Sequence, residues 1–245
     1  MKKILIVLLL GITAVAMSQE KVLLRLNYKK GDIYKMSMKM NQDMGVALMD
    51  MAMDMSLKIT DIKDGNYLTE TKFTYMATKV LQGAEEKVNY NSNMKDDELN
   101  EEGKKFKTQM QPMLDAIIYS SVNKLGESKL LKIEPNVPGV DKLSNQSNKT
   151  VVYPKEKVGV GSTWTNTQSN GGVDMELTYT VTEITKSKVI TKVSGKMSVM
   201  PSAKITGVTE INKNTGIPSK SIMNIEMDMM GKVIKNKAEV TMMKI

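Results

Sequence analysis

Apolar and polar residues alternate along several stretches of this chain, and that period of two constrains the fold more than any other feature. From Met49 to Ile59 every second side chain is methionine, leucine or isoleucine, and small or polar residues stand between them. The stretch from Met36 to Asn41 alternates methionine with polar residues in the same way. Because successive side chains of a β-strand point to opposite faces of a sheet, the pattern predicts strands with one apolar face.

Turn residues and further alternation extend this prediction to most of the chain. Asp64-Gly65-Asn66 marks a turn, and residues 67–77 read as the returning strand. Later strands are expected at 175–184, 188–200, 222–234 and 238–243. The fold class that follows is mainly β, with curved antiparallel sheets in a half-barrel-like arrangement.

One segment has a different period. Residues 96–120 carry apolar side chains at helical spacings, and acidic residues gather at the start, where a helix N-terminus favours them. Gly103 and Pro112 lie inside this segment, which predicts two shorter helices or a kink. The acidic start could alternatively bind a cation.

Two parts of the chain resemble each other. Gly31-Asp32-Ile33-Tyr34 precedes a strand that reads DMSLKITDI, and Gly161-Ser162-Thr163-Trp164 precedes one that reads DMELTYTVTEI. We interpret this as a weak duplication, although any two amphipathic strand pairs share some features. The predicted organisation is a first β unit at 19–133 with a helical insert at about 96–120, and a second unit at 151–245. A linker at 134–150, rich in Pro, Asn, Ser and Gly, joins them.

Residues 1–18 have the composition of a secretory signal peptide. Lys2 and Lys3 precede an apolar stretch that begins at Ile4, and Ala16 and Ser18 fit the −3 and −1 positions of a cleavage site. An uncleaved N-terminal anchor is the alternative. The stretch is too short for a transmembrane helix, and no later apolar run is long enough for one. We therefore expect an exported protein, periplasmic or extracellular.

Composition excludes several kinds of chemistry. The chain has no Cys and no His, so a Ser-His-Asp triad, a Cys nucleophile, a Cys/His zinc site and a disulfide are impossible. The net charge of +8 comes from scattered lysines, and aromatic residues make up 4%, which argues against nucleic-acid binding. No constellation of residues indicates catalysis. We expect a protein that is not an enzyme and has no cofactor.

Methionine is the residue type that stands out. The chain has 23, of which eight lie in residues 36–55 and four more at Met223, Met227, Met229 and Met230. Methionine fills irregular apolar spaces, so these residues could form a plain core or an adaptable groove. Thioethers also bind Cu(I) and Ag(I), but two methionines in a Met-x-Met strand lie about 7 Å apart, so one ion would need a third sulfur from a neighbouring strand.

The leading functional hypothesis is a non-enzymatic binding protein that holds an apolar or amphiphilic, lipid-like ligand. The expected groove residues are Met36, Met38, Met40, Met51, Met53, Met55, Met227 and Met229. Trp164, the single tryptophan, is expected either as a buried anchor or as a ligand platform. The alternatives are a methionine-based Cu(I)/Ag(I) binding protein, and a structural envelope protein with an envelope partner and no small ligand.

Several motifs together resemble an uncharacterised secreted β-rich family of Bacteroidota. They are Gly31-Asp32-Ile33-Tyr34 with the methionine strands behind it, Tyr153-Pro154, the segment from Val158 to Trp164, and the turn from Asn214 to Pro218. More distantly, a helix on a bent antiparallel sheet resembles the periplasmic carriers of the LolA and LppX type. Those carriers hold acyl chains on a concave apolar face. The resemblance implies that the methionine-lined faces take this position, unless the helix at 96–120 fills the space.

Overall fold

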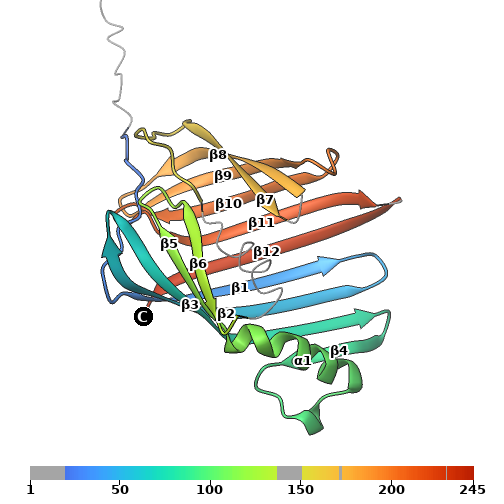
Figure 1. The fold of residues 1–245 in the computed structure, drawn as a ribbon. Coiled ribbons are helices and arrows are strands. Elements are labelled where there is room, and N and C mark those ends of the chain that lie inside the picture. Colours follow the sequence, from blue (N-terminus) through green and yellow to red (C-terminus); the bar gives the residue numbers. More distant parts are fainter. Residues whose placement is uncertain (1–19, 137–150, 171–172, 230) are drawn as a thin grey trace, which may run out of the picture.

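The computed structural model describes residues 20–136, 151–170, 173–229 and 231–245. The predicted signal peptide and residues 137–150 of the predicted linker lie outside this part. Strands dominate the described residues, which confirms the mainly β fold class. One α-helix is present among them, between two strands (Figure 1).

The described strands form one antiparallel sheet. Its order is β6-β5-β3-β2-β1-β12-β11-β10-β9-β8-β7, and β4 pairs with β3 beside this path (Figure 1). The two predicted units therefore share one sheet, which is continuous through the pairing of β1 with β12. The strands are β1 (Ile33–Asp43), β2 (Leu48–Lys63), β3 (Asn66–Gln82), β4 (Glu85–Asn91), β5 (Ile117–Val122), β6 (Ser128–Glu134), β7 (Thr163–Asn170), β8 (Val173–Ile184), β9 (Lys188–Met197), β10 (Lys204–Asn212), β11 (Pro218–Met229) and β12 (Lys232–Lys244).

Turn residues explain why the predicted turn after residue 63 is confirmed and why the predicted strand at 222–234 is wrong. Asp64 and Gly65 both have positive φ, 51° and 76°, and join β2 to β3 as a two-residue hairpin turn, as predicted. The single strand expected at 222–234 is wrong, because β11 ends at Met229 and β12 begins at Lys232. Gly231 has φ +78° and donates its amide to Asp228 Oδ1 over 2.9 Å, so the chain reverses there.

The helical prediction at 96–120 is partly wrong. A short 3-10 helix covers Asp96–Glu98, and α1 covers Glu101–Asp115, capped by Asn100 Oδ1, which accepts the Gly103 amide over 2.7 Å. Residues 117–120 belong to β5 instead, where they pair with β3. Pairing with an available sheet neighbour outweighs the local helical spacing.

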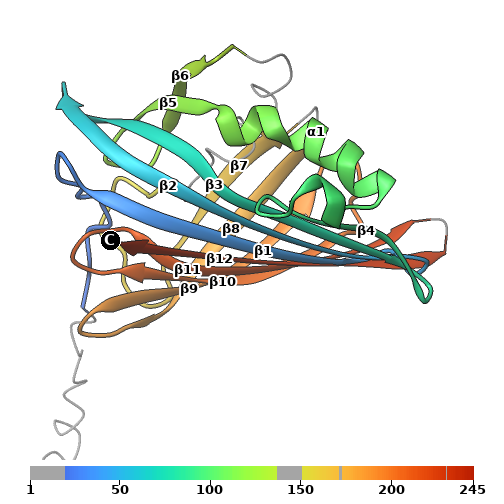
Figure 2. The same ribbon diagram turned by 90° about the horizontal axis from the view of Figure 1, so that it is seen from below.

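The sheet is strongly curved. Tyr67 on β3 and Tyr179 on β8 belong to one buried cluster, although six strands lie between β3 and β8 in the sheet. The cluster connects them through side chains such as Tyr28, whose ring centroid lies 5.2 Å from that of Tyr67, and the sheet bends around this cluster (Figure 2). We call the face that carries Tyr67 and Tyr179 the inner face. Helix α1 lies over β3 and β4 on this side (Figure 2).

One end of the curved sheet is closed by chain outside the strands. The extended segment 20–28 crosses this end, with the Leu26 amide bonded to Lys124 O over 2.9 Å and the Asn27 amide to Thr215 O over 2.8 Å. These bonds tie the turn after β5 to the turn before β11. Leu24, Leu26 and Tyr28 point into the buried cluster that contains Tyr67 and Tyr179. We call this the closed end.

Candidate functional site on the inner face

Methionines from neighbouring strands stand directly opposite one another. In the register of β1 and β2, Met36 pairs with Met55, Met38 with Met53, and Met40 with Met51. Residues opposite each other in an antiparallel pair project to the same side of the sheet. The six methionines predicted on β1 and β2 therefore share the inner face.

Of the two predicted methionines on β11, the structure describes the side chain of Met227 but not that of Met229. Met227 pairs with Ile234 of β12, and the same alternation along β12 leads to Ala238, which pairs with Met40. Met227 thus lies on the inner face too. The Met229 backbone pairs with Lys232 at the end of β11, and its side chain lies outside the described residues.

Burial divides the inner-face methionines into two groups. Met55 is 4% exposed, and Met36 and Met53 pack against the same buried cluster, which includes Met113 of α1. Met175, Met197, Met223 and Met242 pack against the other buried cluster, whereas five inner-face methionines are half-buried and belong to neither cluster of the described residues. We call this second group the methionine strip: Met38, Met40, Met49, Met51 and Met227.

The covering helix explains this division. Phe73, Met76 and Tyr90 project from the inner face of β3 and β4 and pack against Leu99 and other apolar residues at 96–120. The helical insert therefore fills the part of the inner face nearest β3 and β4. It does not cover the strip on β1, β2 and β11.

Several inner-face residues were not among the predicted groove residues. Met49 continues the alternation of β2, so its place was readable from the sequence. Met242 stands opposite Met36, and Val240 opposite Met38, because β12 pairs with β1. That neighbour relation joins residues about 200 positions apart, and the alternation gives no sign of it.

Trp164 lies on the inner face of β7, opposite Tyr179. The two rings are stacked, with centroids 5.3 Å apart and planes 9° apart, and Trp164 is 9% exposed. It belongs to the buried cluster at the closed end, and its indole nitrogen has no hydrogen-bond partner among the described residues. Burial also raises the pKa of Tyr179 to about 12. These contacts place Trp164 apart from the methionine strip.

Two polar side chains lie among the methionines of the strip. Gln42 follows Met40 on the inner face of β1 and pairs with Asn236 of β12. The Asn236 side-chain oxygen is buried and has no hydrogen-bond partner in the described part of the chain. An unpaired buried acceptor costs free energy, so a donor supplied by a ligand would be favourable there.

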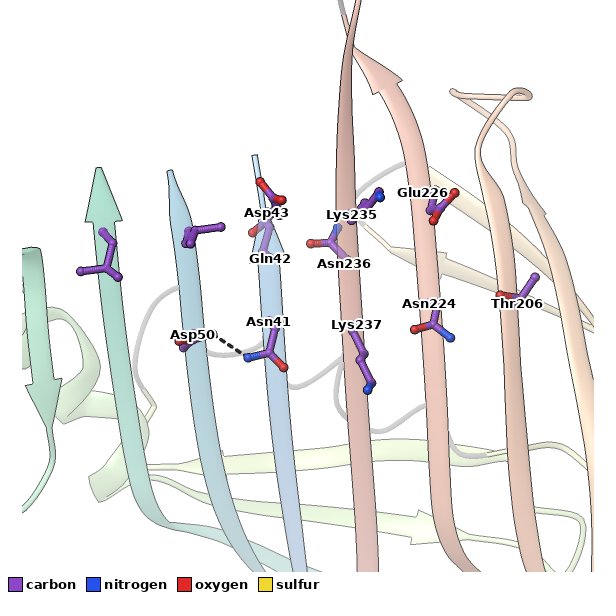
Figure 3. A pocket seen from close by; sticks show the side chains of 12 residues that line it. Asn41, Gln42, Asp43, Asp50, Thr206, Asn224, Glu226, Lys235, Asn236 and Lys237 are labelled. Atoms are coloured by element: carbon purple, nitrogen blue, oxygen red, sulfur yellow. Dashed lines mark hydrogen bonds between the residues drawn. The ribbon is translucent and has the colours of Figure 1, made fainter. Parts of the chain in front are cut away.

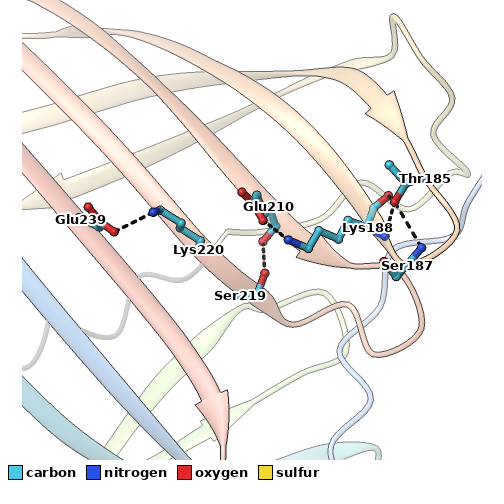
Figure 4. A network of polar contacts seen from close by, with 7 residues as sticks. All are labelled: Thr185, Ser187, Lys188, Glu210, Ser219, Lys220 and Glu239. Atoms are coloured by element: carbon cyan, nitrogen blue, oxygen red, sulfur yellow. Dashed lines mark hydrogen bonds and ion pairs between the residues drawn. The ribbon is translucent and has the colours of Figure 1, made fainter.

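The outer face of the sheet has a different character. Cross-strand ion pairs cover it, such as Lys188 with Glu210 (2.5 Å) and Lys220 with Glu239 (2.8 Å) (Figure 4). A shallow hollow of about 510 Å³ lies near the strand ends, where Asn41 donates to Asp50 over 2.5 Å (Figure 3). The outer face is therefore a solvated polar surface.

The acidic residues before and within α1 are held by lysines. Lys107 contacts Asp96 over 2.6 Å, and Lys104 and Lys105 pair with glutamates one turn earlier in the helix. The hydrogen bond from Lys107 lowers the pKa of Asp96. Among the described residues, no three His, Cys, Asp or Glu side chains group together as a metal site.

Comparisons with known proteins bear on the fold. No protein-family model and no curated protein matches the chain. A solved chain of lipovitellin, from a study of lipid–protein interactions, is similar to it with a TM-score of 0.54 and 12% sequence identity. The match covers 89% of this chain and 25% of the lipovitellin chain, so this chain spans about a quarter of that protein's length. In the described part of the chain, no helix is both long and apolar enough to cross a membrane.

Proposed function

We propose that this chain is an exported, non-enzymatic protein that binds a lipid-like amphiphile on the methionine strip. One observation carries the proposal: a row of methionines is aligned across β1 and β2, half-buried, and outside both buried clusters of the described residues. A plain core would bury these side chains as it buries Met55.

Methionine suits a flexible apolar ligand. Its unbranched, polarisable side chain adapts to several shapes, as acyl chains require. Ligand sites are commonly apolar with a few polar groups that fix orientation. Gln42 and Asn236 supply such groups within the strip, next to Met49. We expect the acyl chain over Met38 and Met51, with a hydrogen-bonding headgroup beside Asn236.

The likeness to lipovitellin supports the proposal at the level of fold. A sheet of this kind occurs in a protein studied for its interactions with lipid. Fold alone does not determine function, so the methionine strip remains the main argument. The proposal of export rests on the sequence of residues 1–18.

Binding of a fluorescent fatty acid to the delipidated mature protein tests this function. We expect saturable binding, and native mass spectrometry of protein from the exported fraction should show lipid-sized adducts. The variant Met38→Gln/Met51→Gln should bind at least about tenfold more weakly, since two polar amides replace apolar contacts.

The matched control is Met243→Gln, because Met243 lies on the outer face of β12 and is 61% exposed. It should bind the probe like the wild type. Absence of probe binding and of adducts in the wild-type protein would favour the structural envelope role instead.

A second candidate is Cu(I) or Ag(I) binding, which one specific observation favours. Met36 stands between Met55 of β2 and Met242 of β12, so three thioethers from three adjacent strands lie in one row. This supplies the third sulfur that a single strand lacks. The variant Met36→Leu/Met242→Leu should then lose Ag(I) binding, measured by calorimetry with the metal alone, and keep its fold. Equal Ag(I) binding by both proteins would eliminate this site.

A further inference from the structure

The tips of the β1–β2 and β11–β12 hairpins lie at the end of the sheet opposite the closed end (Figure 1). Val46 lies in the turn between β1 and β2, Leu48 begins β2, and Val233 lies at the start of β12. They are 55%, 51% and 53% exposed. We call Val46, Leu48 and Val233 the rim.

The two tips are neighbours. Asp43, the last residue of β1, pairs with Lys235 of β12. Beyond this pair, the β-position of Gly45 lies 4.0 Å from Lys232 Cδ. The rim residues therefore form one group and not three isolated positions.

The methionine strip runs up to the rim. Met49 on β2 and Ile234 on β12 are the inner-face residues at these two tips, whereas their neighbours Leu48 and Val233 lie on the outer face, where Leu48 lines the polar hollow. At the other end of these strands, Tyr34 and Ile59 are buried in the cluster that closes the sheet. A ligand that moves along the strip therefore reaches the protein surface at the hairpin tips, which carry apolar side chains on both faces: Met49 and Ile234 on the inner face, and Leu48 and Val233 on the outer face.

Charge at the rim is mixed. Asp43, Glu226 and Asp228 are acidic, and Lys232 and Lys235 are basic. This near balance gives little attraction for a strongly charged partner. Exposed aliphatic side chains at chain reversals instead suit the apolar interior of a lipid surface, where binding grows with the apolar area inserted.

We propose that the rim docks on a lipid surface and that the amphiphile passes between this surface and the methionine strip there. The inference rests on the proposed function and adds the place and direction of ligand entry. It predicts that docking depends on the three aliphatic side chains and little on lipid charge.

Vesicle flotation of the mature protein tests the rim. We expect co-flotation with phosphatidylcholine vesicles, and a similar fraction bound when a fifth of the lipid is anionic. The variant Val46→Ser/Leu48→Ser/Val233→Ser should have an affinity for vesicles that is lower by about tenfold or more. The matched control is Val160→Ser/Leu131→Ser/Val208→Ser, three exposed residues away from the rim, which should float like the wild type.

Soluble-probe binding separates this proposal from the proposed function. If the rim variant still binds the fluorescent fatty acid but no longer floats, both proposals stand. Equal flotation of the rim variant and the wild type, or no flotation of the wild type, overturns the rim whatever the probe shows. If the wild-type protein does not bind the fluorescent fatty acid but floats with vesicles, and the rim variant does not float, the methionine strip is overturned as the ligand site and the rim stands. A dimer that the rim variant converts to a monomer, without vesicle binding, would assign the rim to self-association.

Discussion

Gly31 and Gly161 occupy the same position in two copies of one turn. Their φ angles are +87° and +86°. Gly31 donates its amide to Ile59 O, and Gly161 donates its amide to Val181 O, each over 2.8 Å. In both copies, the acceptor lies on the strand that follows the turn's own strand.

The side chains around the two turns repeat as well. Asp32 accepts the Lys29 amide over 3.0 Å, and Ser162 accepts the Gly159 amide over the same distance. Each acceptor strand then has a register shift, one at Thr60 and one at Thr182. Matching bonds and matching irregularities support the duplication predicted from the sequence.

Replacing either glycine by alanine should destabilise the fold to a similar extent. No other atom lies within 4 Å of the β-position at Gly31 or Gly161, so the cost is that of a positive φ in a residue with a Cβ. We expect about 1 kcal/mol for each variant in urea unfolding. A large difference between Gly31→Ala and Gly161→Ala would argue against equivalent turns.

Asp32 should make stability depend on pH. Its burial would raise its pKa, but hydrogen bonds from Lys244 Nζ (2.6 Å), the Lys29 amide and the Tyr34 hydroxyl outweigh this and lower the pKa. A carboxylate with a lowered pKa in the folded state stabilises the fold above its unfolded pKa of about 3.9, and this contribution is lost as the pH falls through the folded value.

The variant Asp32→Asn measures this contribution. At pH 7 we expect it to be about 2 kcal/mol less stable than the wild type, since charge-assisted hydrogen bonds are lost. The difference should shrink below about pH 4, where the carboxylate becomes protonated in the unfolded chain while it is still ionised in the fold. Urea unfolding at pH 7 and pH 3 gives both values, and a constant difference would mean that Asp32 does not titrate in this range.

Met55 and Met40 should respond differently to truncation, although both are inner-face methionines. Met55 is buried against the cluster below α1, so Met55→Ala should cost about 2–4 kcal/mol. Met40 is half-buried outside both described clusters, so Met40→Ala should cost less than about 1.5 kcal/mol. Thermal unfolding of both variants checks this. Equal, large losses would show that the strip is ordinary core.

Local patterns determined how much of this structure the sequence could predict. The period of two located the strands with methionine on one side, and Asp64-Gly65 located the turn after β2. The order of the strands could not be predicted from the sequence, because β1 pairs with β12 from the other end of the chain, as Met36 does with Met242. The same limit explains the error at Ile117 and Ile118, whose helical spacing yields to pairing with β3.

The division of the site depended on a contact that no periodicity reveals. The sequence placed Met53 and Met55 with Met38 and Met40 as one groove. The structure shows that Met113 of α1 belongs to the same buried cluster as Met55, and that its neighbours in the helix pack against that cluster. Amphipathic spacing predicts that a helix has an apolar face, but it does not say which part of a sheet that face covers.

Trp164 offers a last test, because its position separates a structural contribution from ligand contact. It stacks on Tyr179 inside the closed-end cluster, and the strip begins on strands several positions away in the sheet. Trp164→Phe removes part of this stack and should cost about 1–2 kcal/mol in thermal or urea unfolding. Fatty-acid probe affinity should stay within about twofold of the wild type, since the strip is intact. A tenfold weaker affinity at unchanged stability would instead make Trp164 part of the ligand site and extend that site to the closed end.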